Sequence, residues 1–170
     1  MKVAVKDACV LIDLANGGLL DAWFQLGIET FTTDLVIRQV KTDEQWQAVS
    51  AFVEAGLLQV ETLSGEQIER MGQTLTGLRI GVEDQSALFL AIERQAVLLT
   101  GDRRLRIEAG KHNVDVRGLL WILDELVARR VVPPALAALR LQSMREKGAR
   151  LPGDECEERL RQWTRMSAGG

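Results

Sequence analysis

The chain has 170 residues, of which 46% are hydrophobic and 26% charged, and its formal net charge at pH 7 is −3. This length suits one domain with a full hydrophobic core and is short for two. The negative net charge argues against a protein that binds nucleic acid through positive charge over its whole surface, although it does not exclude a local basic groove. Because no apolar run approaches the length of a membrane span, we expect a cytoplasmic protein.

Few residues are available for zinc or histidine chemistry. Cys9 and Cys156 are far apart and lack the spacing of a zinc site or a disulfide framework, so we expect Cys9 to be buried and Cys156 to be incidental. The single histidine, His112, lies in a polar turn. Any catalysis by this chain must therefore rest on carboxylates.

The first half of the sequence alternates short apolar runs with helical patterns. A strand is predicted at residues 3–5, followed by helices at 8–15 and 19–26 and a strand at 28–32 with period-two alternation. Helix signals resume at Asp34. A capping box at Thr42 opens a helix that ends at Gly56, and residues 57–62 form the next strand. Ser64 caps another helix, and three glycines mark residues 72–81 as a loop.

The second half continues the alternation. Residues 83–95 predict a helix, 96–100 a strand, 103–110 a short helix, 113–116 a last strand and 119–129 a helix. The pair Pro133-Pro134 precedes helices at 135–147 and 154–166, and we expect residues 167–170 to be frayed. Such alternation is typical of an α/β fold with a mostly parallel sheet covered by helices on both faces.

Three acids are expected to meet at one edge of this sheet. Asp7 directly follows the first strand, Asp102 follows the fourth after one glycine, and Asp84 opens the helix that leads into the fourth strand. Parallel α/β sheets carry their functional groups outside the carboxyl ends of the strands. Each aspartate alone could be only a helix cap or a turn residue. Their joint occurrence favours a site in which a divalent cation balances three negative charges.

The segments around these acids resemble the PIN-domain family in order and spacing, namely DACVLI at 7–12, DQSALFLA at 84–91 and LLTGDRRL at 98–105. The resemblance implies a three-layer α/β/α fold over residues 1–132. The helices at 133–166 look like a C-terminal extension, found in relatives similar to VapC-type toxins, that packs on the same domain. It also implies that Asp7, Asp84 and Asp102 hold Mg²⁺ or Mn²⁺ for hydrolysis of RNA, and that Thr100 supports the site through its hydroxyl.

Two positions depart from the family pattern. Gln39 stands where the family has a second acid, and it offers a carbonyl oxygen without charge, so metal affinity should be lower. Glu44 or Glu83 could supply a substitute carboxylate, although each also fits a surface residue. Cys9 stands where a serine or asparagine is more common, and a thiol is a weak hydrogen-bonding group.

The resemblance leaves several functional alternatives open. The favoured one is a metal-dependent ribonuclease, the toxin of a toxin–antitoxin pair, with an antitoxin partner and a homodimeric state. Arg103, Arg104 and Arg106 could hold the RNA backbone or simply solvate a helix face. A catalytically impaired module that binds RNA or protein is the main rival, and a metal-dependent phosphatase is a third possibility. Trp121 and Trp163 could serve a partner or the core.

Overall fold

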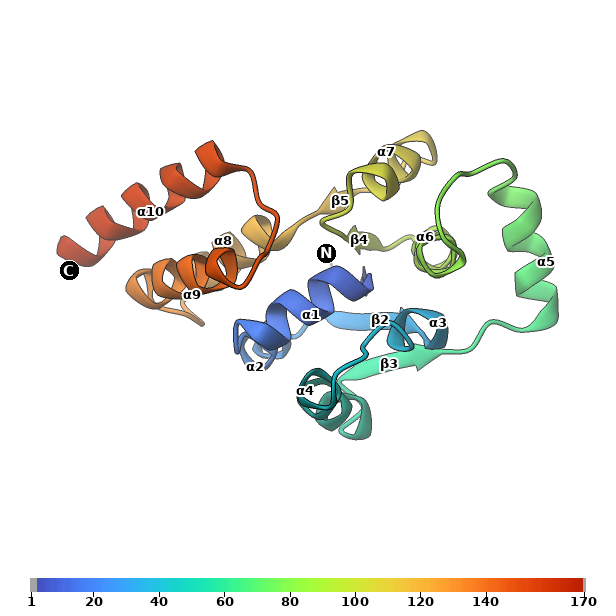
Figure 1. Ribbon diagram of the computed structural model, residues 1–170, viewed down its shortest axis with the longest axis horizontal. Helices are drawn as coiled ribbons and strands as arrows, with labels where there is room; N and C mark the ends of the chain where they lie inside the picture. The colour runs from blue at the N-terminus through green and yellow to red at the C-terminus, as the bar shows by residue number, and fades with distance from the viewer. Residues whose placement is uncertain (1–2, 170) are drawn as a thin grey trace.

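The computed structural model describes residues 3–169, without the side chains of Val3, Ala4 and Lys6 (Figure 1). Its centre is one sheet of five strands in the order β3-β2-β1-β4-β5. The strands are β1 (Val3–Lys6), β2 (Glu29–Thr33), β3 (Leu58–Glu61), β4 (Val97–Leu99) and β5 (Val116–Arg117). All four neighbouring pairs run parallel, which confirms the parallel sheet predicted from the sequence.

The order of the strands creates a switch point beside β1. The chain first builds outward from β1 to β2 and β3, then returns to add β4 and β5 on the other side. In the central register, Val5 of β1 pairs with Phe31 of β2 and with Leu98 of β4. Connections that leave β1 and β4 in opposite directions open a crevice at their carboxyl ends. This crevice is where Asp7 and Asp102 were predicted to meet.

Helices cover the sheet in two groups and give the predicted three layers (Figure 1). One group packs around α1 and comprises α1 (Ala8–Asn16), α2 (Leu20–Gln25), α4 (Asp43–Glu54) and α8 (Leu119–Ala128). The other packs around α6 and comprises α3 (Asp34–Ile37), α5 (Gly65–Thr74), α6 (Val82–Arg94) and α7 (Arg103–Lys111). Leu11, Leu88 and Leu98, from α1, α6 and β4, are each 0% exposed. Each such leucine contributes about 2 kcal/mol by burial.

The C-terminal helices α9 (Pro134–Glu146) and α10 (Gly153–Ala168) pack on the α1 side of the molecule. Met144 of α9 fills the space beside Gly17, where a Cβ atom would lie 2.8 Å from its sulfur. Lys147 donates a hydrogen bond of 2.9 Å to the Asn16 carbonyl. A larger residue at position 17 would force the Met144 side chain to move, so this glycine favours the close approach of α9 to the end of α1.

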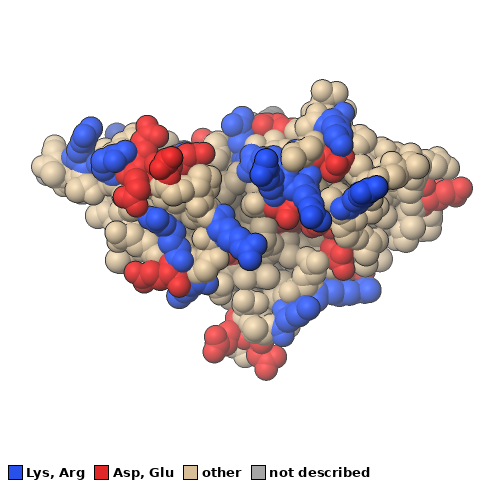
Figure 2. Space-filling model, turned by 45° about the horizontal axis from the view of Figure 1, so that its top comes forward, with Lys and Arg blue, Asp and Glu red and all other residues tan. Residues whose placement is uncertain are grey.

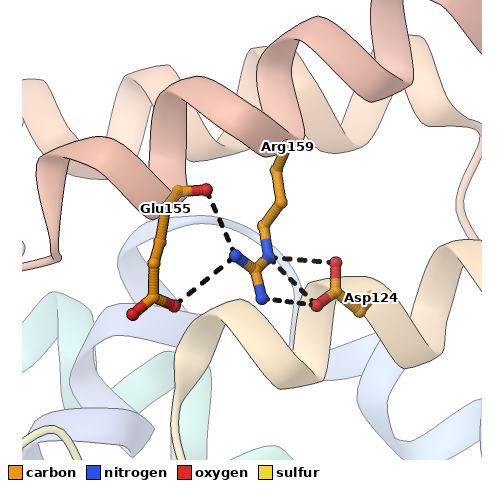
Figure 3. Close-up of polar contacts among 3 residues, drawn as sticks. All are labelled: Asp124, Glu155 and Arg159. Atoms are coloured by element: carbon orange, nitrogen blue, oxygen red, sulfur yellow. Dashed lines mark hydrogen bonds and ion pairs between the residues drawn. The ribbon is translucent and has the colours of Figure 1, made fainter.

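Arg159 ties α10 to α8 (Figure 3). Its Nε and Nη2 donate to both carboxylate oxygens of Asp124 at 2.8–3.1 Å, and its Nη1 reaches the carboxylate and carbonyl of Glu155. Trp163 and Cys156, on the same helix, are buried against the rest of the molecule. Trp163 is therefore a core residue, whereas Trp121 is half-buried and retains exposed surface.

Several local expectations were wrong. Helix α5 continues past Gly72 to Thr74, and α10 continues through Ser167 to Ala168, so these two residues are helical rather than frayed. Gly170 lies outside the described residues. The last strand begins at Val116 instead of residue 113, because Asn113 adopts a left-handed conformation that ends α7. Cys9 is exposed and Cys156 buried, the reverse of the prediction.

Within the part of the chain that the structure describes, no helix combines the length and the apolar character needed to cross a membrane.

Candidate functional site

Asp7 and Asp102 both end a strand and begin a helix at the β1–β4 crevice. Asp7 caps α1 by accepting a hydrogen bond from the Val10 amide at 3.0 Å, and it is only 2% exposed. Asp102 caps α7 in the same way, through Oδ1 and the Leu105 amide at 2.8 Å. The capping role left open by the sequence is thus real for both. It leaves Oδ2 of Asp102 without a hydrogen bond to any residue that the structure describes.

Thr100 joins these two aspartates. Its hydroxyl donates to Oδ2 of Asp7 and accepts from the Asp102 amide at 2.9 Å, and the residue is 0% exposed. The Asp7 amide also donates to the Leu99 carbonyl at 3.1 Å, which fixes the end of β1 against β4. Thr100 therefore lies between two of the three acids and is hydrogen-bonded to both.

Asp84 reaches the same edge from α6 and does not cap that helix. The N-cap is Gly81, which supplies no side chain, and Asp84 lies in the first turn. The start of α6 is held over the sheet by Ser86, whose hydroxyl contacts that of Thr33 at 2.7 Å and donates to the Glu83 carbonyl. Thr33 ends β2 and also caps α3. Because Asp84 is half-buried and is not the N-cap of α6, helix capping does not explain why an acid occupies this position.

The three carboxylates act on one another electrostatically. Burial raises the pKa of Asp84 to about 6, and the charges of Asp7, Asp102 and Glu83 add to this rise. Burial likewise raises the pKa of Asp7, against the opposing effect of its hydrogen bonds and with a further contribution from Asp102. None of the three aspartates forms an ion pair with a lysine or arginine in the described part of the chain. The edge therefore carries negative charge that no lysine or arginine of the described residues pairs with.

The donor set fits a hard divalent cation by chemistry and charge. Carboxylate oxygens without histidine or thiolate ligands are the set that Mg²⁺ and Mn²⁺ prefer. Within the described residues, Asp84 makes no hydrogen bond and Oδ2 of Asp102 is likewise unused, so both can offer oxygens to a cation. As drawn, no three His, Cys, Asp or Glu side chains of the described residues surround a common point. The carboxylates would have to turn to converge on one ion.

Gln39, at the position of the family's second acid, and the two glutamates considered as its substitutes lie in different places. Gln39 follows α3, which packs on α6, and is half-buried. Glu83 lies in the first turn of α6 beside Asp84 and raises its pKa. Glu44 is exposed in the first turn of α4, and no interaction links it to the three acids within the described residues. Of the two glutamates, only Glu83 acts on the acidic edge.

Cys9 takes part in the edge more closely than expected. Its thiol donates to Oδ1 and Oδ2 of Asp7 at 3.1 and 3.3 Å and accepts from the Gly101 amide at 3.3 Å. Partial burial of the sulfur and the charge of Asp7 raise the pKa of Cys9 far above its ordinary value. The thiol therefore stays protonated and serves as a hydrogen-bond donor rather than a nucleophile.

Sequence reasoning missed Asp13. This residue lies on α1, in a hollow of about 260 Å³ that it shares with Cys9 and Asp102. Burial and the charge of Asp7 raise the pKa of Asp13 to about 6. The available signal was a single charged residue within the otherwise apolar run at 8–15.

The three predicted RNA-binding arginines lie on α7, next to Asp102. Arg103 and Arg106 line a groove beside the acidic edge, whereas Arg104 is exposed on the same helix and is absent from that lining. The structure thus distinguishes two of these arginines from the third.

Comparisons with known proteins agree with this architecture. The family described as "DUF3368: PIN domain" matches residues 3–165, a stretch that includes most of α10. The fold is similar to PAE2754 from Pyrobaculum aerophilum, with a TM-score of 0.51 and 20% identity, covering 75% of this chain and 90% of that one. It is also similar to VapBC2 from Rickettsia felis bound to a DNA fragment from their promoter, with a TM-score of 0.50 and 16% identity, covering 68% and 98%. No curated protein matches the chain.

The parallel sheet with its acidic carboxyl edge defines an α/β protein of the PIN type. The family match extends over nearly the whole described chain, and the protein belongs to the PIN-domain family.

Proposed function

We propose that the protein is a divalent-metal-dependent ribonuclease in which Asp7, Asp84 and Asp102 hold Mg²⁺ or Mn²⁺. The observation that carries this proposal is that three carboxylates from separate elements act on one another at one edge of the sheet. Burial first, and then the charges of Asp7, Asp102 and Glu83, raise the pKa of Asp84 to about 6. Without a metal, three ionised carboxylates so close together lower the stability of the fold. A bound dication attracts all three, so that the same carboxylates then stabilise it.

Each residue has a defined part in this reaction. The dication would lower the pKa of a bound water and stabilise the charge that develops on the phosphate. Thr100 holds the Asp7 carboxylate by its hydroxyl, and the cap on α7 holds Asp102, so both acids are kept at this edge of the sheet. Arg103 and Arg106 supply guanidinium donors for phosphate oxygens. No covalent intermediate on the protein is required.

We further propose that the protein is the toxin of a toxin–antitoxin pair. Support comes from the PIN family match and from the VapBC2 neighbour, although its low identity argues only for a shared fold. On this proposal the protein acts in the cytoplasm, an antitoxin silences it, and it forms a homodimer. Residues 1–132 then form the PIN unit, and residues 133–166 form an extension packed on it.

A catalytically impaired RNA- or protein-binding module is the alternative. Two observations favour it: Gln39 leaves the edge one charge short, and no three acids of the described residues already surround a common point. On this reading the Asp7 oxygens are occupied by Val10, Cys9 and Thr100, and the acids serve only the fold.

An RNA cleavage assay distinguishes the two proposals. Mixed-sequence RNA is incubated with the protein in Mn²⁺, in Mg²⁺ and in EDTA, and with the variants Asp84→Asn and Asp43→Asn. Asp43 is a matched control because it also lies in the first turn of a helix but is exposed, and no interaction within the described residues links it to the three acids. Cleavage that requires metal and is lost only in Asp84→Asn supports the nuclease. Intact RNA in every condition, together with retained RNA binding, favours the module.

A further inference from the structure

A groove of about 880 Å³ runs between the core and the C-terminal extension. One wall is formed by α7 and by the β5–α8 junction, and the other by the loop between α9 and α10 and by the first turns of α10. Figure 2 shows lysine and arginine side chains gathered around a central hollow of one face. The residues that give the groove its charge are Arg103, Arg106, Arg117, Arg150 and Arg159.

This lining is positive although the chain as a whole carries −3. Five arginines face only two carboxylates, Asp13 and Glu155, among the lining residues. Arg117 and Arg159 are already paired with Asp115 and Asp124.

The other three arginines of the lining, Arg103, Arg106 and Arg150, form no ion pair within the described residues. They therefore leave uncompensated positive charge in a confined space, where it attracts anions more strongly than on an open surface.

One of these guanidinium groups is fixed in place by the backbone. Arg106 Nη2 donates to the Thr100 carbonyl at 3.2 Å, directly behind the acidic edge. It lies over Gly118, where a Cβ atom would approach Nη2 to 3.1 Å. A side chain at position 118 would therefore crowd the Arg106 guanidinium group. A preoriented cation loses less entropy when it binds a ligand.

The groove is continuous with the acidic edge. Asp13, Gly101 and Arg150 line both this groove and the smaller hollow that contains Cys9 and Asp102. Arg150, in the loop between α9 and α10, therefore faces the acids from across the crevice. Carboxylates at one end and arginines along the rest form one path.

We propose that this groove is the track for a single-stranded RNA substrate, closed on one side by the C-terminal extension. The proposal rests on the proposed nuclease function and assigns the extension a role in it. A phosphodiester placed at the acids has further phosphates on either side, and the arginines lie where those phosphates would continue. A positively charged groove that follows the backbone is how proteins hold a single strand without reading its sequence.

An acidic peptide is the other polyanion that such a groove could take. RNA is favoured because the arginines continue directly from carboxylates, which a metal would turn into a phosphate-binding point. A peptide carboxylate has no need of that acidic end. The two occupants remain separate outcomes of the test.

The test measures binding without cleavage. A fluorescein-labelled single-stranded RNA of about ten nucleotides, within the site size of single-strand binders, is titrated with the full chain in EDTA and followed by anisotropy. The groove variants are Arg103→Ala and Arg150→Ala. Their matched controls are Arg104→Ala, on the same helix as Arg103, and Arg161→Ala, on α10, both exposed and outside the groove lining. Each variant removes one positive charge, so general electrostatics is held constant.

We expect Kd to rise about tenfold in each groove variant, as for the loss of one charge-assisted phosphate contact, and less than about twofold in each control. The salt slope should also fall by about 0.7 in the groove variants. Equal effects on Kd in all four variants would contradict the proposal that the groove holds the RNA. So would unmeasurable RNA binding by the unmodified chain, or tighter binding of a polyglutamate peptide with the same dependence on Arg150.

Failure of the groove and failure of the nuclease are separable. If metal-dependent cleavage is lost in Asp84→Asn while both groove variants bind RNA normally, the proposed RNA groove is wrong and the proposed ribonuclease activity is supported. If the groove variants lose binding while no metal supports cleavage, the RNA track stands and the nuclease is wrong.

Discussion

Replacing Asp84 with asparagine should stabilise the metal-free protein at neutral pH. The pKa of Asp84 is raised to about 6 in the fold, so the native state binds its proton more tightly than the unfolded chain does. The stabilisation given by the protonated carboxyl is complete below the unfolded pKa and is lost as pH rises through about 6. At pH 7 Asp84 is ionised and lowers the free energy of unfolding, whereas asparagine resembles the uncharged, protonated carboxyl group.

The magnitude follows from the size of this rise. A change from 3.8 to about 6 corresponds to about 3 kcal/mol at most. Because Asp84 is only half-buried, water lessens both the cost of burying its charge and the repulsion from its neighbours, and we expect about 1–2 kcal/mol. For a chain of this length each kcal/mol moves the midpoint of thermal unfolding by about 2–4 °C.

The assay is urea unfolding in EDTA, followed by circular dichroism at pH 4 and pH 7. Asp84→Asn should exceed the unmodified protein in free energy of unfolding at pH 7 and match it near pH 4. Asp43→Asn, an exposed aspartate in the first turn of α4, should show no gain at either pH. A loss of stability in Asp84→Asn at pH 7, or a gain of the same size at both pH values, would refute the repulsion argument.

Three further substitutions test neighbouring parts of the account. Gln39→Glu restores the family's second acid and should tighten Mn²⁺ binding about tenfold, or about 1.4 kcal/mol; unchanged affinity in calorimetry would place position 39 outside the site. Thr100→Val removes the hydroxyl that joins Asp7 and Asp102 and should cost about 1–3 kcal/mol in urea unfolding, whereas Thr100→Ser should retain most of the stability. Arg159→Lys keeps the charge but loses the forked contact with Asp124, and a cost of about 1–2 kcal/mol is expected; no measurable cost would mean that hydrophobic packing alone holds α10 in place.

Much of the fold could be predicted because local patterns agreed with the final packing. The period-two run at residues 28–32 and the helical apolar spacing at 119–129 each produced the expected element. Boundaries were less predictable where one residue's backbone conformation decides them, as with Asn113 at the end of α7. The helix after Ser64 also ran past Gly72, since a solvent-exposed glycine costs a helix only about 1 kcal/mol.

The candidate site could be predicted in outline but not in its details. Strand ends place Asp7 and Asp102 at one edge, because both follow neighbouring parallel strands. The contact of Thr33 with Ser86, which holds α6 and hence Asp84 over that edge, joins residues 53 positions apart. Nor does any local pattern bring the loop containing Arg150 over the acids, because that depends on how α9 packs against Gly17. Such long-range contacts are set by tertiary packing.

The most direct test of the central claim is a calorimetric titration of Mn²⁺ into the metal-free protein at pH 7, with Asp84→Asn and Asp43→Asn alongside. We expect Mn²⁺ to bind in the micromolar to submillimolar range to the unmodified protein and to Asp43→Asn, and we expect Asp84→Asn to lose that binding. Absence of binding to the unmodified protein, or equal binding to all three, would contradict the claim that Asp7, Asp84 and Asp102 form one divalent-cation site.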